Sequence, residues 1–210
     1  MRRLATILIT GALLCSSPFA PKAAAQYPGE RPNYTLSPAQ AKQVIAGRAR
    51  QVMIAIKNRD MRTLASYVHP RKGVRFSPYA YVDKTHRVLN RQQLVRLYNS
   101  RQRLVWGEYD GSGDPIRLTL RQYLSRFVYR QDLLTDKDPS YNPERPQGGG
   151  TTINNIGEAY RGNIIVVGYG HEGITAPQGG GMDWQALFLV FEKLGTQWYL
   201  IGVVNDEWTI

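Results

Sequence analysis

A long amphipathic helix is predicted to begin near residue 37. Ser37-Pro38-Ala39-Gln40 combines an N-cap serine, a proline at the first helical position and a glutamine three residues after the cap. The apolar residues that follow recur at helical spacing on one face: Ala41, Val44, Ile45, Ala49, Val52, Met53 and Ile56. A second, shorter helix is expected after Asp60, ending at His69-Pro70, with these residues inward: Met61, Leu64, Ala65 and Val68.

The pattern changes to a period of two between Gly73 and Asp83, which predicts a strand. Its two faces differ in character. One carries apolar residues, namely Val74, Phe76, Ala80 and Val82, and the other carries Arg75, Ser77, Tyr79, Tyr81 and Asp83. Pro78 has no N–H to donate to a ladder, so we expect an edge strand or a bulge here.

The remaining segments predict two more short helices and a largely β C-terminal third. Asn90 and Thr119 each precede a glutamine by three residues and are followed by apolar residues at helical spacing. A strand over 104–109 leads into turn-forming residues, and prolines, glycines and polar residues over 132–152 indicate a long mobile loop. Strands are expected over 163–171, 184–192 and 197–210, paired antiparallel because the turn at Gly195 is too short for a parallel crossover.

These elements predict one α+β domain over residues 37–210. Its long N-terminal helix and short helices would pack on a curved antiparallel sheet, giving a cone-like shape. About 185 residues remain once a leader is removed, which is enough for a single packed core.

The first 25 residues are predicted to be a secretory signal peptide. Met1-Arg2-Arg3 is basic, an apolar run from Leu4 to Leu14 follows, and Ala23-Ala24-Ala25 offers small residues for cleavage. Residues 26–36 then form an extended linker. The alternative is a lipoprotein cleaved before Cys15, which is less favoured because the preceding residue is Leu14 and not a small one.

Export constrains the chemistry of the mature chain. Cys15 is the only cysteine, so cleavage after Ala25 leaves no thiol nucleophile, disulfide or thiolate metal site. The net charge falls from +11 to +8, because Arg2, Arg3 and Lys22 are lost with no acidic residue. We therefore expect an exported protein, periplasmic or extracellular, without a transmembrane segment in its mature chain. Its partners would be a small molecule or an anionic cell-envelope component, and no nucleic acid.

The order of helices and strands resembles the cone-shaped fold of nuclear transport factor 2 and ketosteroid isomerase. A second resemblance, from about Lys57 to the C-terminus, is to a group of uncharacterised exported bacterial domains. It rests on short strings: Val68-His69-Pro70, Gly73-Val74-Arg75-Phe76-Ser77-Pro78-Tyr79-Ala80, Asp110-Gly111-Ser112-Gly113-Asp114-Pro115, Ile153-Asn154-Asn155-Ile156, Met182-Asp183-Trp184 and Asp206-Glu207-Trp208-Thr209-Ile210. Together these resemblances imply export and a shared fold, and they assign no catalytic residue.

The polar face of the strand over 73–83 is the predicted ligand site. An arginine fork with two phenols at alternate positions can hold an anionic or polar ligand, and the candidate contacts are Arg75, Ser77, Tyr79, Tyr81 and Asp83. The other interpretation is an exposed strand face with cross-strand hydrogen bonds. On the first interpretation the protein is a non-catalytic domain that binds a small ligand or a cell-envelope partner.

Two other functions stay open. A small acid–base enzyme, an isomerase or hydrolase, would need a carboxylate base and a tyrosine in a shared cavity, and the available residues are Tyr79, Tyr81, Tyr109, Asp83, Glu108 and Asp110. A homo-oligomerisation module, such as a homodimer, would instead cover one sheet face with a second copy.

Other motifs point to no further chemistry, and we expect no metal or cofactor. The segment 110–121 lacks the glycine and the bidentate glutamate of a calcium loop. The two glycine runs, 147–150 and 178–181, lack the lysine of a phosphate loop. His69, His86 and His171 form no close pair typical of zinc sites, and His69 is expected to be a capping or buried polar residue. Asp206 and Glu207 are adjacent on a strand, so they point to opposite faces rather than flanking one glycosidic bond.

Overall fold

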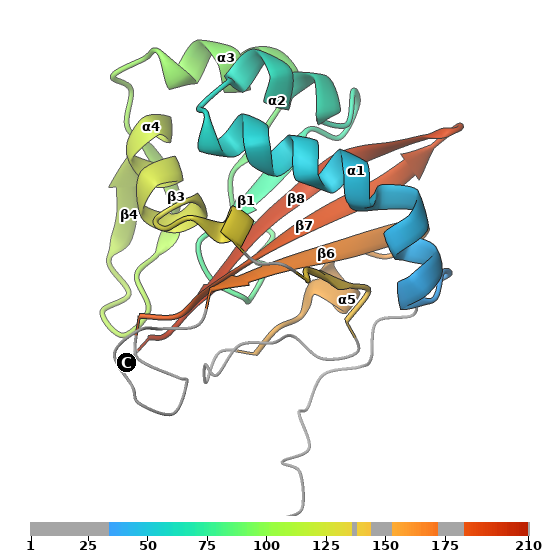
Figure 1. Cartoon of the computed structure of the whole chain (residues 1–210). Coiled ribbons are helices and arrows are strands. Elements are labelled where there is room, and N and C mark those ends of the chain that lie inside the picture. The colour runs from blue at the N-terminus through green and yellow to red at the C-terminus, as the bar shows by residue number, and fades with distance from the viewer. Residues whose placement is uncertain (1–33, 136–137, 144–152, 172–182, 210) are drawn as a thin grey trace, which may run out of the picture.

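A computed structural model of the chain describes residues 34–135, 138–143, 153–171 and 183–209. The architecture is α+β, as predicted: helices cover one face of a six-stranded sheet, and a two-stranded hairpin stands beside it (Figure 1). The predicted leader, nearly all of the linker and both glycine runs lie outside the described residues. In the described part, no helix has the length and apolar character needed to cross a bilayer.

Four helices begin at the predicted caps. Helix α1 spans Pro38–Lys57 with a complete capping box at Ser37, and α2 spans Met61–Tyr67 with Asp60 as its cap. Helices α3, Arg91–Tyr98, and α4, Leu120–Tyr123, also begin at capping boxes. Helix α4 continues into a π-helical turn, η1, over Leu124–Val128. A short 3₁₀ turn, η2 (Leu133–Thr135), and a short helix, α5 (Ile156–Ala159), complete the helical elements.

The large sheet has the strand order β2-β1-β8-β7-β6-β5. The bounds are Val74–Ser77 for β1, Val88–Leu89 for β2, Ser140–Tyr141 for β5, Ile164–His171 for β6, Gln185–Leu194 for β7 and Gln197–Glu207 for β8. The antiparallel pairing of β6, β7 and β8 confirms the prediction for this part of the chain. The expectation of a wholly antiparallel sheet is wrong, because β1 pairs with β8 in parallel.

Strand β1 is shorter and more central than predicted. It lies between β2 and β8 and ends at Ser77, so Pro78 follows the last ladder residue and its missing N–H breaks no ladder bond. Beyond Pro78 the predicted alternate residues also no longer lie on one face of the sheet. Phe76 packs in the main core beneath the helices, whereas Val82 packs in a smaller cluster with Ile156 and Trp184.

The predicted loop over 132–152 is partly structured. Leu133 in η2 is fully buried, and β5 pairs with β6 as the edge strand of the sheet. Asn142, which is 1% exposed, donates from its side chain to the carbonyl of Leu36 at 2.8 Å and accepts from the amide of Val166 at 2.9 Å. The loop prediction is wrong for these residues, because side-chain hydrogen bonds and apolar burial fix the chain where local composition favours irregular structure.

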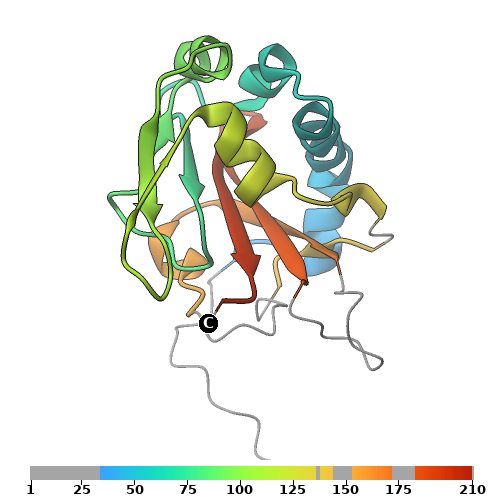
Figure 2. The same cartoon turned by 90° about the vertical axis from the view of Figure 1, so that its left-hand side faces the viewer.

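The two-stranded hairpin of β3, Leu104–Glu108, and β4, Pro115–Leu118, stands beside β1 and α4 (Figure 2). Its inner face joins the main core through Trp106 and Ile116, both fully buried. Trp106 stacks on Tyr123 with ring centroids 4.1 Å apart and donates to the carbonyl of Leu118 at 2.9 Å. This packing holds the hairpin opposite the segment that follows β1.

Candidate functional site

A hollow of about 740 Å³ lies between the segment after β1 and the β3–β4 hairpin. It is lined by residues 79–87 on one side and 105–115 on the other: Tyr79, Tyr81, Asp83, Thr85, His86, Arg87, Val105, Gly107, Glu108, Tyr109, Asp110, Gly111, Gly113 and Pro115. The turn that joins β3 to β4 contains Gly111 and Gly113, whose positive φ values of 84° and 71° are ones that glycine adopts without strain. The two walls therefore come from segments that only tertiary packing brings together.

The structure gathers part of the predicted ligand face around this hollow. Tyr79, Tyr81 and Asp83 line it, and the other three residues named for an acid–base site, Glu108, Tyr109 and Asp110, line it as well. Arg75 and Ser77 are not among the lining residues, because β1 ends before the hollow begins. The predicted single face is therefore divided between a strand and the loop after it.

Arg75 organises the loop instead of facing the hollow. Its Nη1 donates to the carbonyl oxygens of Asp83, Lys84 and His86 at 3.0, 2.8 and 3.1 Å. Three carbonyls on one guanidinium nitrogen fold the segment 83–86 back over the end of β1. The arginine fork proposed for an anionic ligand is thus used to shape the backbone that forms the wall.

His86 is held as a neutral imidazole in this wall. Its Nδ1 accepts the backbone N–H of Asp83 at 3.1 Å and lies 3.1 Å from the Ser77 hydroxyl, which is fully buried. Burial, together with the charge of Arg75 and against the opposing charge of Asp83, lowers the pKa of His86 to about 4. Because Nδ1 accepts, the ring proton of the neutral form is on Nε2.

Gly107 permits the close approach of this imidazole to the hairpin. Its φ is 145°, and a Cβ at this position would lie 3.1 Å from His86 Nε2 and 3.2 Å from a carbon of Pro78. A side chain here would be both strained and crowded. The glycine therefore sets the width of the hollow at its base.

Negative charge predominates around the hollow. Three carboxylates, those of Asp83, Glu108 and Asp110, face one guanidinium, that of Arg87, which donates to the Val105 carbonyl at 3.3 Å. Asp83 accepts from the amide and hydroxyl of Thr85, both at 2.7 Å, and these hydrogen bonds lower the pKa of its carboxyl. The hollow is thus acidic in a chain whose formal charge is +11.

The three tyrosines of the hollow differ in how firmly they are held. Tyr79 meets Phe127 edge-on at 5.8 Å, and burial raises the pKa of its phenol. Tyr109 also packs against Phe127, at 6.3 Å between ring centroids. Tyr81 makes no ring contact of this kind among the described residues and is 49% exposed. Two fixed rings and one exposed ring are therefore available to a ligand.

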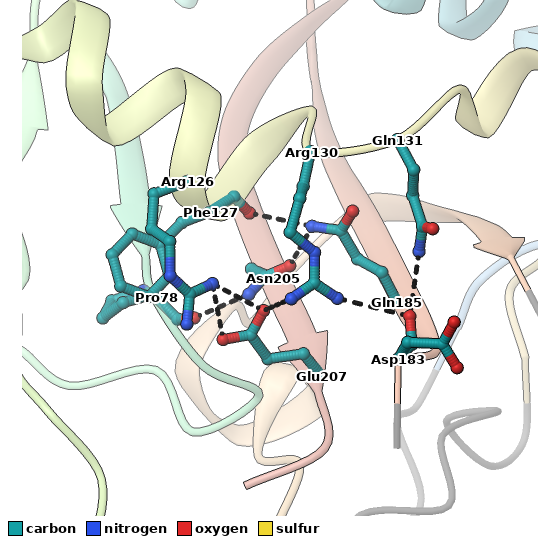
Figure 3. Close-up of polar contacts among 9 residues, drawn as sticks. All are labelled: Pro78, Arg126, Phe127, Arg130, Gln131, Asp183, Gln185, Asn205 and Glu207. Atoms are coloured by element: carbon teal, nitrogen blue, oxygen red, sulfur yellow. Dashed lines mark hydrogen bonds and ion pairs between the residues drawn. The ribbon is translucent and has the colours of Figure 1, made fainter. Parts of the chain in front are cut away.

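At the end of β8 a buried carboxylate pairs with two partly exposed arginines, a feature that sequence reasoning missed. Figure 3 shows Arg126, from η1, and Arg130 converging on Glu207. The Nη1 of Arg126 lies 2.9 Å from the carboxylate and the Nη1 of Arg130 lies 3.5 Å from it, and Glu207 is only 3% exposed. Two arginines four residues apart, with a lone glutamate near the C-terminus, were the only signal in the sequence.

Buried amides near this ion pair hold the chain at the start of the hollow (Figure 3). Gln185 donates from Nε2 to the side chain of Asn205 at 2.7 Å and to the carbonyl of Phe127 at 3.4 Å. Asn205 donates in turn to the carbonyl of Pro78 at 2.9 Å. The network fixes Pro78, and with it the direction in which the chain enters the hollow.

Asp206 lies on the opposite face of β8 from Glu207, as the alternation of a strand requires. It pairs in register with Ala186, which belongs to the second apolar cluster, whereas Glu207 pairs with Gln185. Burial raises the pKa of Asp206 to about 7, with a further contribution from the charge of Glu207. The two carboxylates thus act in separate environments.

The structure also tests the prediction made for His69. His69 is buried and its Nδ1 accepts from the amides of Arg71 and Lys72 at 3.2 and 2.9 Å, which confirms a capping role. Within the described ranges, no three His, Cys, Asp or Glu side chains come close enough to hold a metal ion.

Comparison of the chain with protein-family models, curated proteins and solved structures finds no match. The geometry and charge of the hollow are therefore the features from which a function can be inferred.

Proposed function

We propose that this protein is an exported, non-catalytic binding domain that holds a small, positively charged ligand in the hollow between the β1–β2 segment and the β3–β4 hairpin. The observation that carries the proposal is the composition of the walls. Three tyrosines and three carboxylates line the hollow with a single guanidinium. Export rests on the basic and apolar pattern of residues 1–25, and the similarity to the nuclear transport factor 2 cone rests on element order.

The charge of the walls favours a cation over the anion that the sequence suggested. An anionic ligand would need a free guanidinium. The Nη1 of Arg75 is engaged by three backbone carbonyls, and Arg87, which lines the hollow, donates from Nε and Nη2 to the carbonyl of Val105. A cation would instead meet carboxylates and the faces of aromatic rings, and a cation over a tyrosine ring gains about 0.5–2 kcal/mol. Alkylammonium groups, including quaternary ones, combine both requirements.

The arrangement supports binding better than acid–base catalysis. A carboxylate base in an apolar cavity has a raised pKa, whereas hydrogen bonds from Thr85 lower the pKa of Asp83. Glu207 is buried near tyrosines, but two arginines neutralise it. Asp83 therefore lacks the raised pKa expected of a base, and Glu207 is held in its ion pairs. Asp206, whose pKa burial raises, is not among the residues that line the hollow.

Assembly through an apolar face is supported less. The large apolar side chains exposed in the described part are scattered over separate elements: Val44, Tyr81, Val88, Ile153 and Trp208. A protomer that forms a stable homodimer would be expected to expose a contiguous apolar patch of several hundred Å² for its partner to cover.

The proposal is tested by thermal shift with two cations, choline and spermidine, and two controls, benzoate and the neutral choline isostere 3,3-dimethyl-1-butanol. Binding should raise the Tm with the cations only. Glu108→Gln and Tyr81→Ala should reduce the shift, and the matched control Glu158→Gln, an exposed carboxylate on α5, should not. Equal shifts from the cation and its isostere, or from benzoate, would overturn the charge argument.

A further inference from the structure

Two arginines near the acidic hollow share a single carboxylate. Arg126 lies 2.9 Å from the carboxylate of Glu207, and Arg130 lies 3.5 Å from it. Two guanidinium charges against one carboxylate leave a formal surplus of one positive charge. The side chains of Arg126 and Arg130 are 43% and 36% exposed, whereas that of Glu207 is 3% exposed. The surplus charge is therefore on groups that solvent, and a ligand, can reach.

Arg126 keeps hydrogen-bond donors for another acceptor. Its Nη1 donates to Glu207, which is its only hydrogen-bond acceptor within the described ranges. A guanidinium carries five N–H groups, so those on Nε and Nη2 are open to a further acceptor. Arg130 is more fully engaged, because its Nη2 also donates to the carbonyl of Asp183 at 3.3 Å. Arg126 is thus the arginine better placed to bind a second anion.

A single aromatic ring separates Arg126 from the wall of the hollow. Its guanidinium carbon lies 4.6 Å from the ring centroid of Phe127. The same ring meets the ring of Tyr79 at 5.8 Å and that of Tyr109 at 6.3 Å, and both tyrosines line the hollow. Figure 3 shows Arg126 on the side of Glu207 on which Pro78, the residue before Tyr79, also lies. Arg126 therefore stands at the edge of the hollow.

Opposite charges consequently lie inside the hollow and at this edge. The carboxylates of Asp83, Glu108 and Asp110 line the hollow, and Arg126 supplies positive charge just outside it. An anion alone would be repelled by the three carboxylates, and a cation alone would leave the donors of Arg126 unused. A ligand that carries both charges is complementary to the hollow and to its edge.

The position of Arg126 also limits how far apart the two charges of such a ligand can be. Arg126 is not among the lining residues, so an anionic group must extend past the tyrosine rings to reach it. An anionic group attached directly beside the ammonium would stay among the wall carboxylates. A link of two carbons lets the anionic group extend beyond the rings while the ammonium stays over them. A phosphate suits this position, because the guanidinium fork matches its geometry.

We propose that the ligand of the hollow is a zwitterion of the phosphocholine type. Its alkylammonium group lies among the tyrosine rings and carboxylates of the walls, and its phosphate accepts hydrogen bonds from Arg126. This inference rests on the proposed function, because the hollow must first select the ammonium group. Arg126 is then a specificity-determining residue, and its ion pair with Glu207 holds it at the edge of the hollow.

Isothermal titration with choline, phosphocholine and ethyl phosphate tests the inference. The unmodified protein should bind phosphocholine about tenfold more tightly than choline, as expected for one charge-assisted hydrogen bond. Arg126→Gln should reduce this ratio of affinities to about one, because the phosphate loses its donor. The matched control Arg161→Gln removes the same charge from an exposed position between α5 and β6, and should leave the ratio unchanged within about twofold.

A second variant keeps the ion pair with Glu207. Arg126→Lys retains the positive charge but lacks the planar fork, so the ratio should fall by about threefold. Co-sedimentation with phosphatidylcholine vesicles separates two sources of the zwitterion. Pelleting would identify a lipid headgroup, and binding of free phosphocholine without pelleting would identify a soluble ligand; both results support the site.

The remaining outcomes contradict the inference in different ways. Equal affinities of the unmodified protein for choline and phosphocholine, or an unchanged ratio in Arg126→Gln, would overturn the role of Arg126 and leave the cation site of the hollow standing. Binding of ethyl phosphate as tight as that of phosphocholine would also overturn it, because the hollow would then contribute nothing. Failure of both choline and phosphocholine to bind would refute the proposed function together with this inference.

Discussion

Asp206→Asn should stabilise the protein increasingly as the pH rises. The carboxyl of Asp206 is 4% exposed, and its pKa is about 7 in the folded protein against 3.8 for an ordinary aspartate. The folded state holds the proton of Asp206 more tightly than the unfolded state does. The stabilisation that this proton gives to the folded state is therefore fully present below pH 3.8 and is lost as the pH rises through 7. Asparagine has a similar shape and never ionises.

The size of the effect follows from the two pKa values. A difference of about three units corresponds to about 4 kcal/mol once both states are ionised, and roughly 2–3 kcal/mol of this falls between pH 5 and pH 8. Asp206→Asn and the unmodified protein should therefore differ in free energy of unfolding by roughly 2–3 kcal/mol more at pH 8 than at pH 5. Subtracting one protein from the other removes the contributions of all other titrating groups, His86 included.

Urea unfolding at the two pH values measures this difference. A control, Glu158→Gln, removes an exposed carboxylate on α5 and leaves Asp206 in place, so its difference from the unmodified protein should change little between the two pH values. Parallel pH dependence for Asp206→Asn and the unmodified protein would refute the reasoning, because it would mean that the carboxyl is not desolvated in the folded state.

Three other substitutions test the parts that build the hollow. Glu207→Gln should lower the free energy of unfolding by about 1 kcal/mol in urea titrations, because it removes the counter-charge of two partly exposed arginines, and an unchanged free energy of unfolding would contradict this role. Gly107→Ala should lower both the Tm and the affinity for choline, because the Cβ of the alanine would lie 3.1 Å from His86 Nε2 and the backbone φ is positive. An unchanged Tm would show that the imidazole can move away from the added methyl group. Arg75→Met should weaken choline binding and increase hydrogen exchange at Asp83, because it removes the donor to three loop carbonyls; normal exchange protection there would contradict its organising role.

Local signals in the sequence predict the helices well, because a cap and its partner lie three residues apart. Ser37, Asn90 and Thr119 each accept from the residue expected, and the helices begin there. The antiparallel C-terminal strands follow equally directly from a short turn at Gly195. Such features depend on neighbours in the chain, so no knowledge of tertiary packing is needed.

The hollow is predicted only in part, for a physical reason. The alternation of apolar and polar residues predicted that Arg75 and Tyr79 share one face of a strand. The chain leaves the strand at Pro78, because its carbonyl accepts a hydrogen bond from Asn205 on β8, which is distant in sequence. Arg126 and Glu207 are 81 residues apart in sequence and meet only because η1 packs on β8. Contacts of this kind depend on how elements pack, and periodicity carries no information about them.

We propose above that the hollow selects a small cation by charge. Isothermal titration with choline and with its neutral isostere 3,3-dimethyl-1-butanol, on the unmodified protein and on Glu108→Gln, tests it most directly. We expect choline to bind, the isostere to give no measurable heat, and Glu108→Gln to weaken choline binding as one of three wall carboxylates is lost. Equal affinities for choline and the isostere, or undiminished choline binding by Glu108→Gln, would contradict the claim.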